Sequence, residues 1–304
     1  AHIYRILFLT ILPIILSQTV YQISGLIDYY LFGDVMGSRG IDPVTIKSLV
    51  GVYSSKYRVL TSVPIAISTS IASSMIPSAV TAFTQRDTEQ LQYNILSGIK
   101  FNMIIAFPSA VGMAVLAVPI IHSIYPSMDY HMGSTMMIIG SSCIIFYALS
   151  TVTSGVLQSI DQMRLPVIHA AISLAIHVVL LVVLVMTGMN IHAVVWANIF
   201  FAFLMCVLNS RSIAKYMRYR QEVRRTFFVP LLASALMGAA AFGVYHGLYV
   251  LCKSNAISVL VACIAAVIVY GVALLVLKGL TEEELLGFPK GRTLVRIVKK
   301  LHLM

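Results

Sequence analysis

The sequence predicts an all-α membrane protein, a polytopic bundle of about eight transmembrane helices. Hydrophobic residues make up 59% of the 304 residues, charged residues make up 11%, and the mean hydropathy is +0.91. Most of such a chain cannot face water. Its apolar runs are continuous rather than alternating, and this favours helices over the strands of a membrane barrel.

Eight apolar segments are long enough to cross a bilayer, which takes about 20 residues in a helix. They lie near residues 3–32, 57–83, 95–122, 132–158, 165–188, 190–210, 227–251 and 255–277. Residues 33–56, between the first two, read as a solvated external loop with a short helix beginning at Asp42. Pro64, Pro77 and Pro108 fall inside the second and third segments and predict helix bends.

The excess of positive charge follows the positive-inside rule. With both termini in the cytoplasm, 15 of the 21 Lys and Arg residues fall on the cytoplasmic side. An even number of spans fits this arrangement, and it accounts for the sequence pI of about 9.5 without a nucleic-acid partner. We therefore expect a multi-pass protein of the cell membrane that has both ends of this segment in the cytoplasm.

Two basic regions are expected on the cytoplasmic side. Residues 211–226 extend the sixth segment as a basic helix, and residues 278–304 form a basic tail. Within the tail, Thr281 and Glu284 have the spacing of a capping box. Further on, an apolar stripe opposite basic residues favours a helix on the anionic membrane surface over a merely solvated tail. The basic residues expected to anchor it are Arg296, Lys299 and Lys300.

Three ionisable residues, Asp28, Arg58 and Lys100, fall within or at the ends of the apolar segments. A charge at the bilayer centre costs about 2.5 to 3.5 kcal/mol, so each is a candidate for a substrate cavity. Asp28 and Arg58 lie near the external ends of neighbouring helices, where we expect them to face one cavity and to pair. The alternative places both at the membrane interface and lets Lys100 snorkel to lipid headgroups.

The remaining residues argue against an enzyme. His169 and His177, in the fifth segment, are expected to be packed rather than to bind a ligand or relay protons. The four cysteines lack close metal-ligand spacing, so neither a disulfide framework nor a zinc site is expected. The sequence holds no H-E-x-x-H, G-x-S-x-G or P-loop motif, and we expect no hydrolase, no nucleotide-driven pump, no metal and no cofactor.

Several stretches resemble one transporter superfamily. They are "YSSKYRVLTSVPIAISTSIASSMIPSAV", "FNMIIAFPSAVGMAVLAVPIIHSIY", "SGVLQSIDQMRLPVIHAAISLAIHVVLLVVLV" and the closing "FPKGRTLVRIVKKLHLM". Over essentially its whole length the chain resembles the polysaccharide-export branch of the multidrug/oligosaccharidyl-lipid/polysaccharide exporter superfamily. Within that branch it is similar to the stage V sporulation protein B-like transporters, relatives of the lipid II flippase. These stretches are general sequence patterns of helices rather than catalytic signatures, so they indicate the family more specifically than the substrate.

The resemblance implies a transporter of about fourteen spans, built from two six-helix lobes and an extra pair of helices. Residues 1–210 would be the second lobe and residues 227–277 the extra pair. The first lobe would then be missing, in line with a chain that begins without methionine. Arg58 falls where family members are thought to hold a diphosphate, and Asp28 lies in a similar "LID" context. The implied activity is the export, by alternating access, of a polyprenyl-diphosphate-linked sugar or a peptidoglycan-type precursor.

The resemblance also suggests how transport could be driven, since protonation of Asp28 or binding of Na⁺ there would couple it to an ion gradient. Three alternatives stay open. A cation-coupled multidrug exporter of the same superfamily should want more cavity carboxylates than Asp28 alone. A membrane-embedded glycosyl or acyl transferase should carry a large external loop, and a scaffold of envelope synthesis should tolerate the loss of Arg58.

Overall fold

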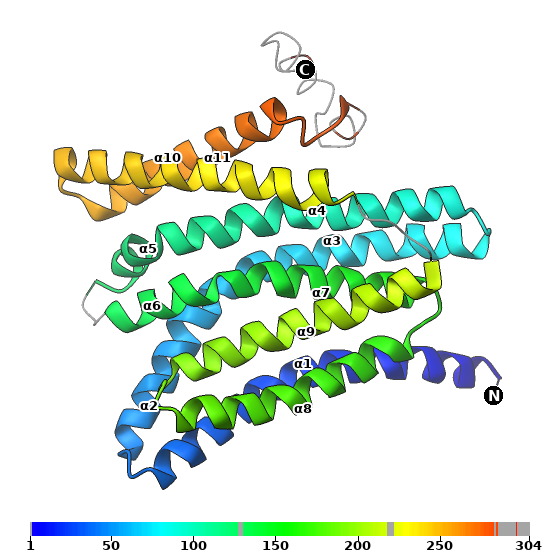
Figure 1. Ribbon diagram of the computed structural model, residues 1–304, viewed down its shortest axis with the longest axis horizontal. Helices are drawn as coiled ribbons and strands as arrows, with labels where there is room; N and C mark the ends of the chain where they lie inside the picture. The colour runs from blue at the N-terminus through cyan, green and yellow to red at the C-terminus, as the bar shows by residue number, and fades with distance from the viewer. Residues whose placement is uncertain (1, 127–129, 218–221, 283, 285–295, 297–304) are drawn as a thin grey trace.

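The computed structural model describes residues 2–126, 130–217, 222–282, 284 and 296, and every regular element within these ranges is a helix (Figure 1). The predicted all-α class is confirmed. The α-helices are α1 (His2–Ser38), α2 (Pro43–Val52), α3 (Val59–Thr84), α4 (Thr88–Val115), α5 (Ala117–Ile124), α6 (His131–Gly140), α7 (Ser142–Ser159), α8 (Arg164–Met186), α9 (His192–Met217), α10 (Val229–Cys252) and α11 (Asn255–Val276). Two π-helical turns, η1 (Tyr53–Arg58) and η2 (Arg224–Phe228), directly precede α3 and α10.

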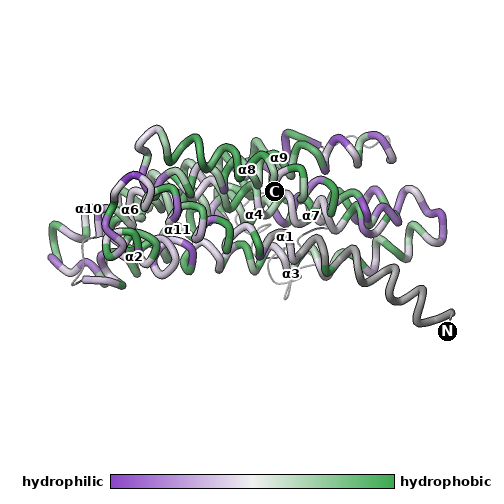
Figure 2. The backbone as a smooth tube through the Cα atoms, turned by 90° about the horizontal axis from the view of Figure 1, so that it is seen from below, coloured by the Kyte–Doolittle hydropathy of each residue, from purple (hydrophilic) through white to green (hydrophobic). Residues whose placement is uncertain are grey.

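Seven helical segments in the described ranges are long and apolar enough to cross a membrane, so the chain is a multi-pass membrane protein. They run over residues 43–84, 88–115, 142–159, 164–186, 192–217, 224–252 and 255–276, and each overlaps one of the last seven predicted spans. α1 covers the first predicted span, although most of its side chains before Gln22 lie outside the described part of the chain. In Figure 2 the hydrophilic residues lie mainly toward the ends of the helices.

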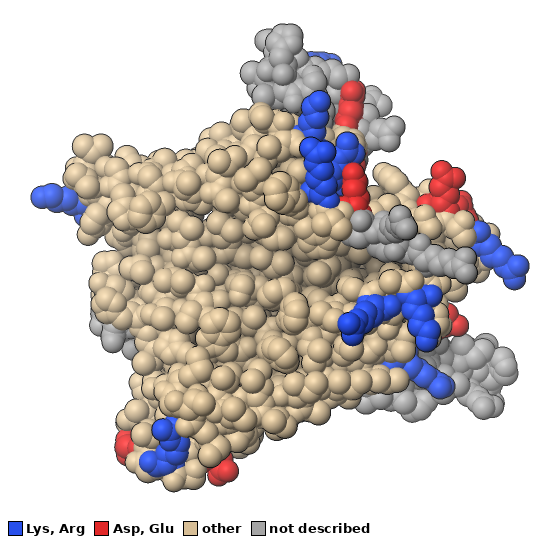
Figure 3. Space-filling view, viewed as in Figure 1, with Lys and Arg blue, Asp and Glu red and all other residues tan. Residues whose placement is uncertain are grey.

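The long helices pack side by side in an order that differs from their order in the sequence (Figure 1). α1 packs on α8, α8 on α9, α9 on α7, and α7 on both α3 and α4. α10 packs against α4 and α11 against α5, so this last pair lies at the edge opposite α1 and α8. Charged side chains gather at the ends of the helices and leave the middle of the visible face uncharged (Figure 3). This distribution suits a bundle whose middle lies in hydrocarbon.

The prediction of a long external loop over residues 33–56 is wrong. α1 continues to Ser38, and the connection to α2 is short and turns at Gly40, where φ is +79°. The predicted start at Asp42 is confirmed, because its carboxylate accepts hydrogen bonds from the backbone N–H groups of Val44 and Thr45 at 3.0 and 3.2 Å. From Pro43 the chain is helical without interruption to Thr84, since no proline follows Pro43 before the predicted second span and Gly51 is accommodated within α2.

Two predicted spans are divided in the structure. The third is split at Leu116 into α4 and α5, and the fourth is split at Ser141 into α6 and α7. The second break lies beside Gly140, where an added Cβ would overlap the ring of Tyr57. The Tyr57 hydroxyl donates to the Gly140 carbonyl at 3.3 Å. The glycine therefore lets η1 pack closely against the junction of α6 and α7.

The α10–α11 pair is attached to α4 and α5 by polar contacts as well as apolar ones. Proline has no N–H, so Pro108 leaves the Ile104 carbonyl of α4 without its helical donor. The Tyr270 hydroxyl on α11 supplies a replacement hydrogen bond of 2.6 Å to that oxygen. At the other end of α11, the Asn255 side-chain amide donates to the Pro119 carbonyl on α5 at 3.0 Å. The first contact satisfies a carbonyl that Pro108 would otherwise leave unpaired, and the second joins α11 to α5.

Candidate functional site

A cavity of about 610 Å³ lies between α1, the η1–α3 segment and α7. Asp28 and Arg58 both line it, and Lys100 is not among its lining residues. Hydroxyl and amide side chains in the lining can hold water or a polar headgroup within the bundle. The other polar lining residues are Gln22, Ser24, Tyr53, Tyr57, Thr61, Ser62, Thr69, Ser73, Tyr147, Thr151, Ser154, Gln158 and Asn198.

Asp28 lies in the wall of this cavity, 3% exposed, at the centre of a polar network. Its Oδ1 atom is 2.6 Å from Nε2 of His177 on α8, and its Oδ2 atom accepts a hydrogen bond of 2.7 Å from Nδ2 of Asn198 on α9. The Tyr147 hydroxyl on α7 in turn donates to Oδ1 of Asn198 at 3.1 Å. A buried carboxylate is tolerated only with partners of this kind. The network therefore joins α1, α7, α8 and α9.

The local sequences of α1 and α8 place these side chains on facing sides. On α1, Ser24, Asp28 and Phe32 recur every four residues and are all buried, so they share the face that packs on α8. On α8, His177 lies on the buried face, and its ring meets the edge of Phe201 with 5.8 Å between ring centroids. Packing thus holds the imidazole in place beside Asp28.

Arg58 supplies a cation to the same cavity from the end of η1. Its guanidinium lies against Gly25, one turn before Asp28, where an added Cβ would be 2.5 Å from Nη1. The predicted pairing of Asp28 with Arg58 is wrong, because both carboxylate oxygens of Asp28 are taken by His177 and Asn198. Within the described residues, no carboxylate lies within ion-pair distance of Arg58.

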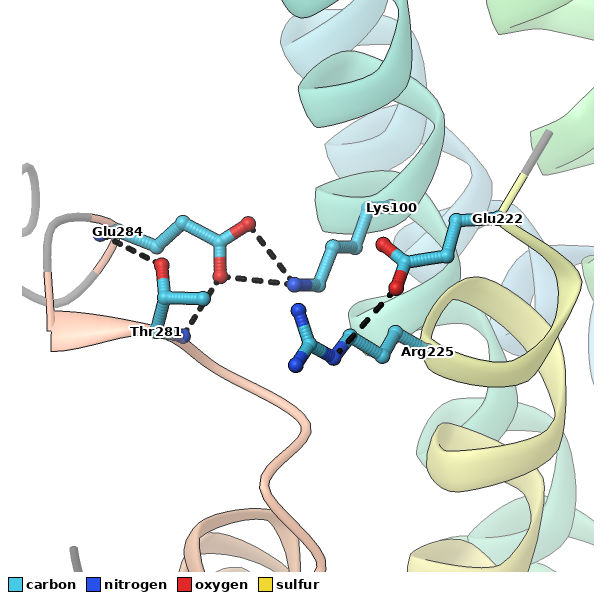
Figure 4. Close-up of polar contacts among 5 residues, drawn as sticks. All are labelled: Lys100, Glu222, Arg225, Thr281 and Glu284. Carbon is cyan, nitrogen blue, oxygen red and sulfur yellow. Dashed lines mark hydrogen bonds and ion pairs between the residues drawn. The ribbon is translucent and has the colours of Figure 1, made fainter. Parts of the chain in front are cut away.

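Lys100 lies elsewhere, on the face of α4 near the tail, and it is 5% exposed. Its ammonium group is 2.7 and 2.8 Å from the two carboxylate oxygens of Glu284 (Figure 4). Snorkelling to headgroups is therefore not its arrangement. The predicted capping box is confirmed, because Glu284 accepts from the Thr281 N–H at 2.8 Å and its own N–H donates to the Thr281 hydroxyl at 3.3 Å. Figure 4 shows Arg225 and Glu222, at the start of η2, close to this pair.

A second polar network, which sequence analysis missed, lies further along the same helices. Nδ1 of His169 on α8 is 2.8 Å from Oδ1 of Asn209 on α9, and Nε2 of His169 is 3.3 Å from the Ser212 hydroxyl. Asn209 is fully buried and donates to the Ser154 hydroxyl at 2.9 Å. A detectable signal was the spacing of Asn198 and Asn209, eleven residues apart and so on one helical face of an apolar segment.

The remaining predicted residues lie on the tail or outside the described part. Arg296 is exposed, and Lys299 and Lys300 lie outside the described residues, so anchoring at the membrane surface stays a prediction. A search of the described ranges finds no group of three or more His, Cys, Asp or Glu residues placed to hold a metal ion.

Comparison with known proteins places this geometry in a family context. Residues 5–129 match the model of a family described as polysaccharide biosynthesis protein. The lipid II flippase MurJ of Bacillus subtilis (strain 168) is 23% identical over 236 residues, which are 75% of this chain and 42% of that protein. The chain thus spans less than half the length of this relative.

Solved structures share the fold of this chain. One is a lipid II flippase MurJ in an inward closed conformation, with a TM-score of 0.66 and 18% identity over 84% of this chain and 51% of that one. The predicted resemblance to the multidrug/oligosaccharidyl-lipid/polysaccharide exporter superfamily is confirmed as a likeness, by the family match and the MurJ relative together with the shared fold. A second structure, of a MATE protein in the bent conformation, has a TM-score of 0.57 and 11% identity over 86% of this chain and 63% of that one. At these identities the structures show a shared fold.

Proposed function

We propose that this chain is part of a flippase that exports a lipid-linked oligosaccharide or a peptidoglycan-type precursor across the cell membrane. In this proposal residues 1–210 form the second lobe of a two-lobe transporter and residues 227–277 form the additional pair. The polysaccharide family match and the likeness to a lipid II flippase support the substrate class. The proposed protein transports without catalysing a covalent change.

The observation that carries the proposal is the charge of the cavity. Arg58 is exposed there without a carboxylate partner among the described residues, whereas Asp28 is engaged by His177 and Asn198. A free guanidinium in a water-accessible cleft suits a diphosphate, which it can bind through paired N–H donors. The polyprenyl chain of such a substrate can stay in lipid between helices, so the cavity needs to hold only the headgroup.

We further propose that two lobes rock about this cavity and expose it alternately to each side of the membrane. The distribution of basic residues supports a cytoplasmic location for both ends of this segment, and the proposal lays the tail on the inner leaflet. No cofactor is required, because an ion gradient acting at Asp28 supplies the energy. Proton and Na⁺ are the two candidate coupling ions.

A multidrug exporter of the MATE type is the second candidate, favoured by the structural likeness to a MATE protein. It fits the cavity less well. A pocket for cationic drugs needs a carboxylate that is free to bind the cation, and the cavity carboxylate Asp28 already has two partners. The exposed cavity charge in the described lining is that of Arg58, which favours an anionic substrate.

Substitution of Arg58 in the full-length protein tests the proposal. Proteoliposomes are loaded with a fluorescent polyprenyl-diphosphate-linked sugar, and the rate at which the label becomes accessible on the opposite leaflet is measured. Arg58→Ala should abolish this movement, and Arg58→Lys should retain part of it because the charge remains while bidentate binding is lost. Full activity of Arg58→Ala would refute the proposed role, and transport of cationic dyes by the unmodified protein would favour the multidrug exporter.

A further inference from the structure

On α8 one buried residue, Ser173, lies between the two polar networks of the second-lobe core and belongs to neither of them. His169, Ser173 and His177 recur every four residues on α8, so they lie one turn apart on the same face. The two histidines are about 12 Å apart along the helix axis. The Ser173 hydroxyl lies between them, fully buried and without a hydrogen-bond partner.

The end of this row that contacts Asp28 has a second polar atom without a hydrogen-bond partner. Nδ1 of His177 is also buried without a hydrogen-bond partner, while Nε2 of the same ring is bonded to Asp28. The backbone of Ala197 on α9 lies near this ring without forming a hydrogen bond to Nδ1. Buried polar atoms are almost always paired with protein or with ordered water, so two orphaned atoms one turn apart suggest a site for water.

The other end of the row, at His169, lies close to the end of the bundle where α8 begins and α9 ends. Asn209 donates through Nδ2 to the Ser154 hydroxyl and the Thr153 hydroxyl, so its Oδ1 atom must accept from Nδ1–H of His169. Nε2 of His169 then carries a lone pair directed at the half-buried Ser212. A neutral imidazole in this state can take up a proton from the Ser212 side.

We propose that Ser212, His169, Ser173 and His177 form a water-assisted proton path through the second-lobe core. It connects the end of the bundle that carries Arg211 and Lys215 to Asp28. This inference rests on the proposed function and deepens it, because it makes the coupling ion a proton. The neighbours of Asp28 support this choice. Its carboxylate contacts two nitrogen atoms, whereas an alkali cation requires a shell of oxygen ligands.

Proton uptake at Asp28 would change the contact between helices. In the structure Asp28 and His177 together need one shared proton for their 2.6 Å bond. A second proton taken up at Nδ1 of His177 lets the shared proton move from Nε2 onto Oδ1 of Asp28, so the carboxylate becomes neutral and its charge-assisted bonds to His177 and Asn198 weaken. Release of the carboxyl proton into the cavity, followed by rotation of the His177 ring that returns its remaining proton to the Asp28 side, restores the original bond and completes the transfer. No other reactant is consumed.

Other titratable groups near this pair come from two neighbouring elements. Tyr53 and Arg58 of η1 and Cys143 of α7 interact electrostatically with it or with one another. Near neutral pH an arginine keeps its charge and tyrosine and buried thiol groups stay neutral, so Asp28 and His177 are the members that exchange protons.

The test compares two matched serine variants in proteoliposomes of the full-length protein. Ser173→Ala interrupts the path, while Ser68→Ala removes an equally buried and unpartnered hydroxyl in α3, outside it. Movement of a fluorescent polyprenyl-diphosphate-linked sugar is followed under a pH gradient and, separately, under a Na⁺ gradient. We expect only the pH gradient to accelerate it, and Ser173→Ala and His169→Gln to slow the accelerated rate about tenfold or more. Ser68→Ala should match the unmodified protein.

Acceleration by Na⁺, or equal behaviour of the two serine variants, would overturn the proton path while leaving the flippase proposal intact. A second readout needs no transport. Infrared spectroscopy follows the protonation of the Asp28 carboxyl group after a pH jump, with Asp28→Asn identifying the band. We expect Ser173→Ala to slow this protonation about tenfold. An unchanged rate would overturn the path, and a slowed rate without any lipid movement would support the path but refute the proposed function.

Discussion

The cavity region and the contact between α4 and the α10–α11 pair use buried polar groups in opposite ways. At the α4 contact the polar groups are paired with one another: Lys100 with Glu284, and the Ile104 carbonyl with Tyr270. In the cavity a charge is left over, since Arg58 has no carboxylate partner among the described residues. Each region contains a cation that the sequence places in or near an apolar segment, Lys100 in one and Arg58 in the other. Of these two, only Arg58 remains free to bind a ligand.

The difference separates charges that hold the fold together from charges that are available to a ligand. A fully paired buried group costs stability when its partner is removed, but it offers nothing to a substrate. An unpaired group in a cavity offers binding energy and contributes little to stability. Substitutions at the α4 contact should therefore lower stability more than transport, and substitutions in the cavity should lower transport more than stability. The four changes below run from the largest expected effect on stability to the smallest.

Lys100→Ala should cost about 3 to 5 kcal/mol in the free energy of unfolding, because it leaves the Glu284 carboxylate partly buried without its cation. Unfolding in mixed detergent and dodecyl sulfate micelles measures this. The double variant Lys100→Met with Glu284→Gln should recover most of the loss, because no unpaired charge remains. If the single variant unfolds like the unmodified protein, the contact is not a structural one.

Asp28→Asn should cost about 2 kcal/mol, because its new amide nitrogen faces either His177 or the amide donor of Asn198 and leaves a buried group unsatisfied. We expect it also to abolish gradient-driven movement of the lipid-linked probe. The same unfolding assay and the transport assay, run on one preparation, check both effects. Normal transport by Asp28→Asn would place the coupling site elsewhere.

Tyr270→Phe should cost about 1 kcal/mol, since it removes one hydrogen bond in the bundle and returns the Ile104 carbonyl to an unpaired state. Transport per folded molecule should stay unchanged, because the contact lies away from the cavity. Pro108→Ala in the same background should restore the stability, as it gives that carbonyl its helical donor again. A transport defect in the folded Tyr270→Phe protein would contradict a purely structural role.

Gly25→Ala should change stability least and still weaken transport. Its Cβ would lie 2.5 Å from Nη1 of Arg58, and the end of a flexible side chain can shift at little cost. The displaced guanidinium should then bind the diphosphate less well, which titration of the probe headgroup reports as a higher Kd. Gly37→Ala is the matched control, because it is on the same helix and meets nothing within 4 Å. Equal binding by both variants would show that Arg58 does not bind the diphosphate.

Much of the fold could be predicted from the sequence, and the errors have a common cause. Asp42 and the Thr281–Glu284 capping box are local signals, and both are confirmed. The external loop was predicted because residues 33–56 are glycine-rich and polar at their start, yet Lys56 is 2% exposed and its ammonium lies 5.5 Å from the centre of the Tyr125 ring. A long aliphatic stem can be buried while its charge finds a partner, and hydropathy does not register that.

The candidate site divides in the same way. Asp28 and Arg58 could be singled out because a charge in an apolar segment is costly wherever that segment packs. The partner of Asp28 could not, because His177 is 149 residues away and belongs to a helix whose facing side depends on the whole bundle. Lys100 was grouped with the cavity for the same reason, although it pairs 184 residues away with the tail.

The sequence by itself determined that this chain is helical, that it lies in a membrane, where most of its spans fall and which charges are out of place. These properties depend on backbone hydrogen bonding within a segment and on the transfer of that segment from water, and both are local. Only the tertiary structure decided which charges are neutralised and which remain for a ligand. That choice depends on which helix faces meet, and many packings of equally apolar helices would satisfy the same sequence pattern.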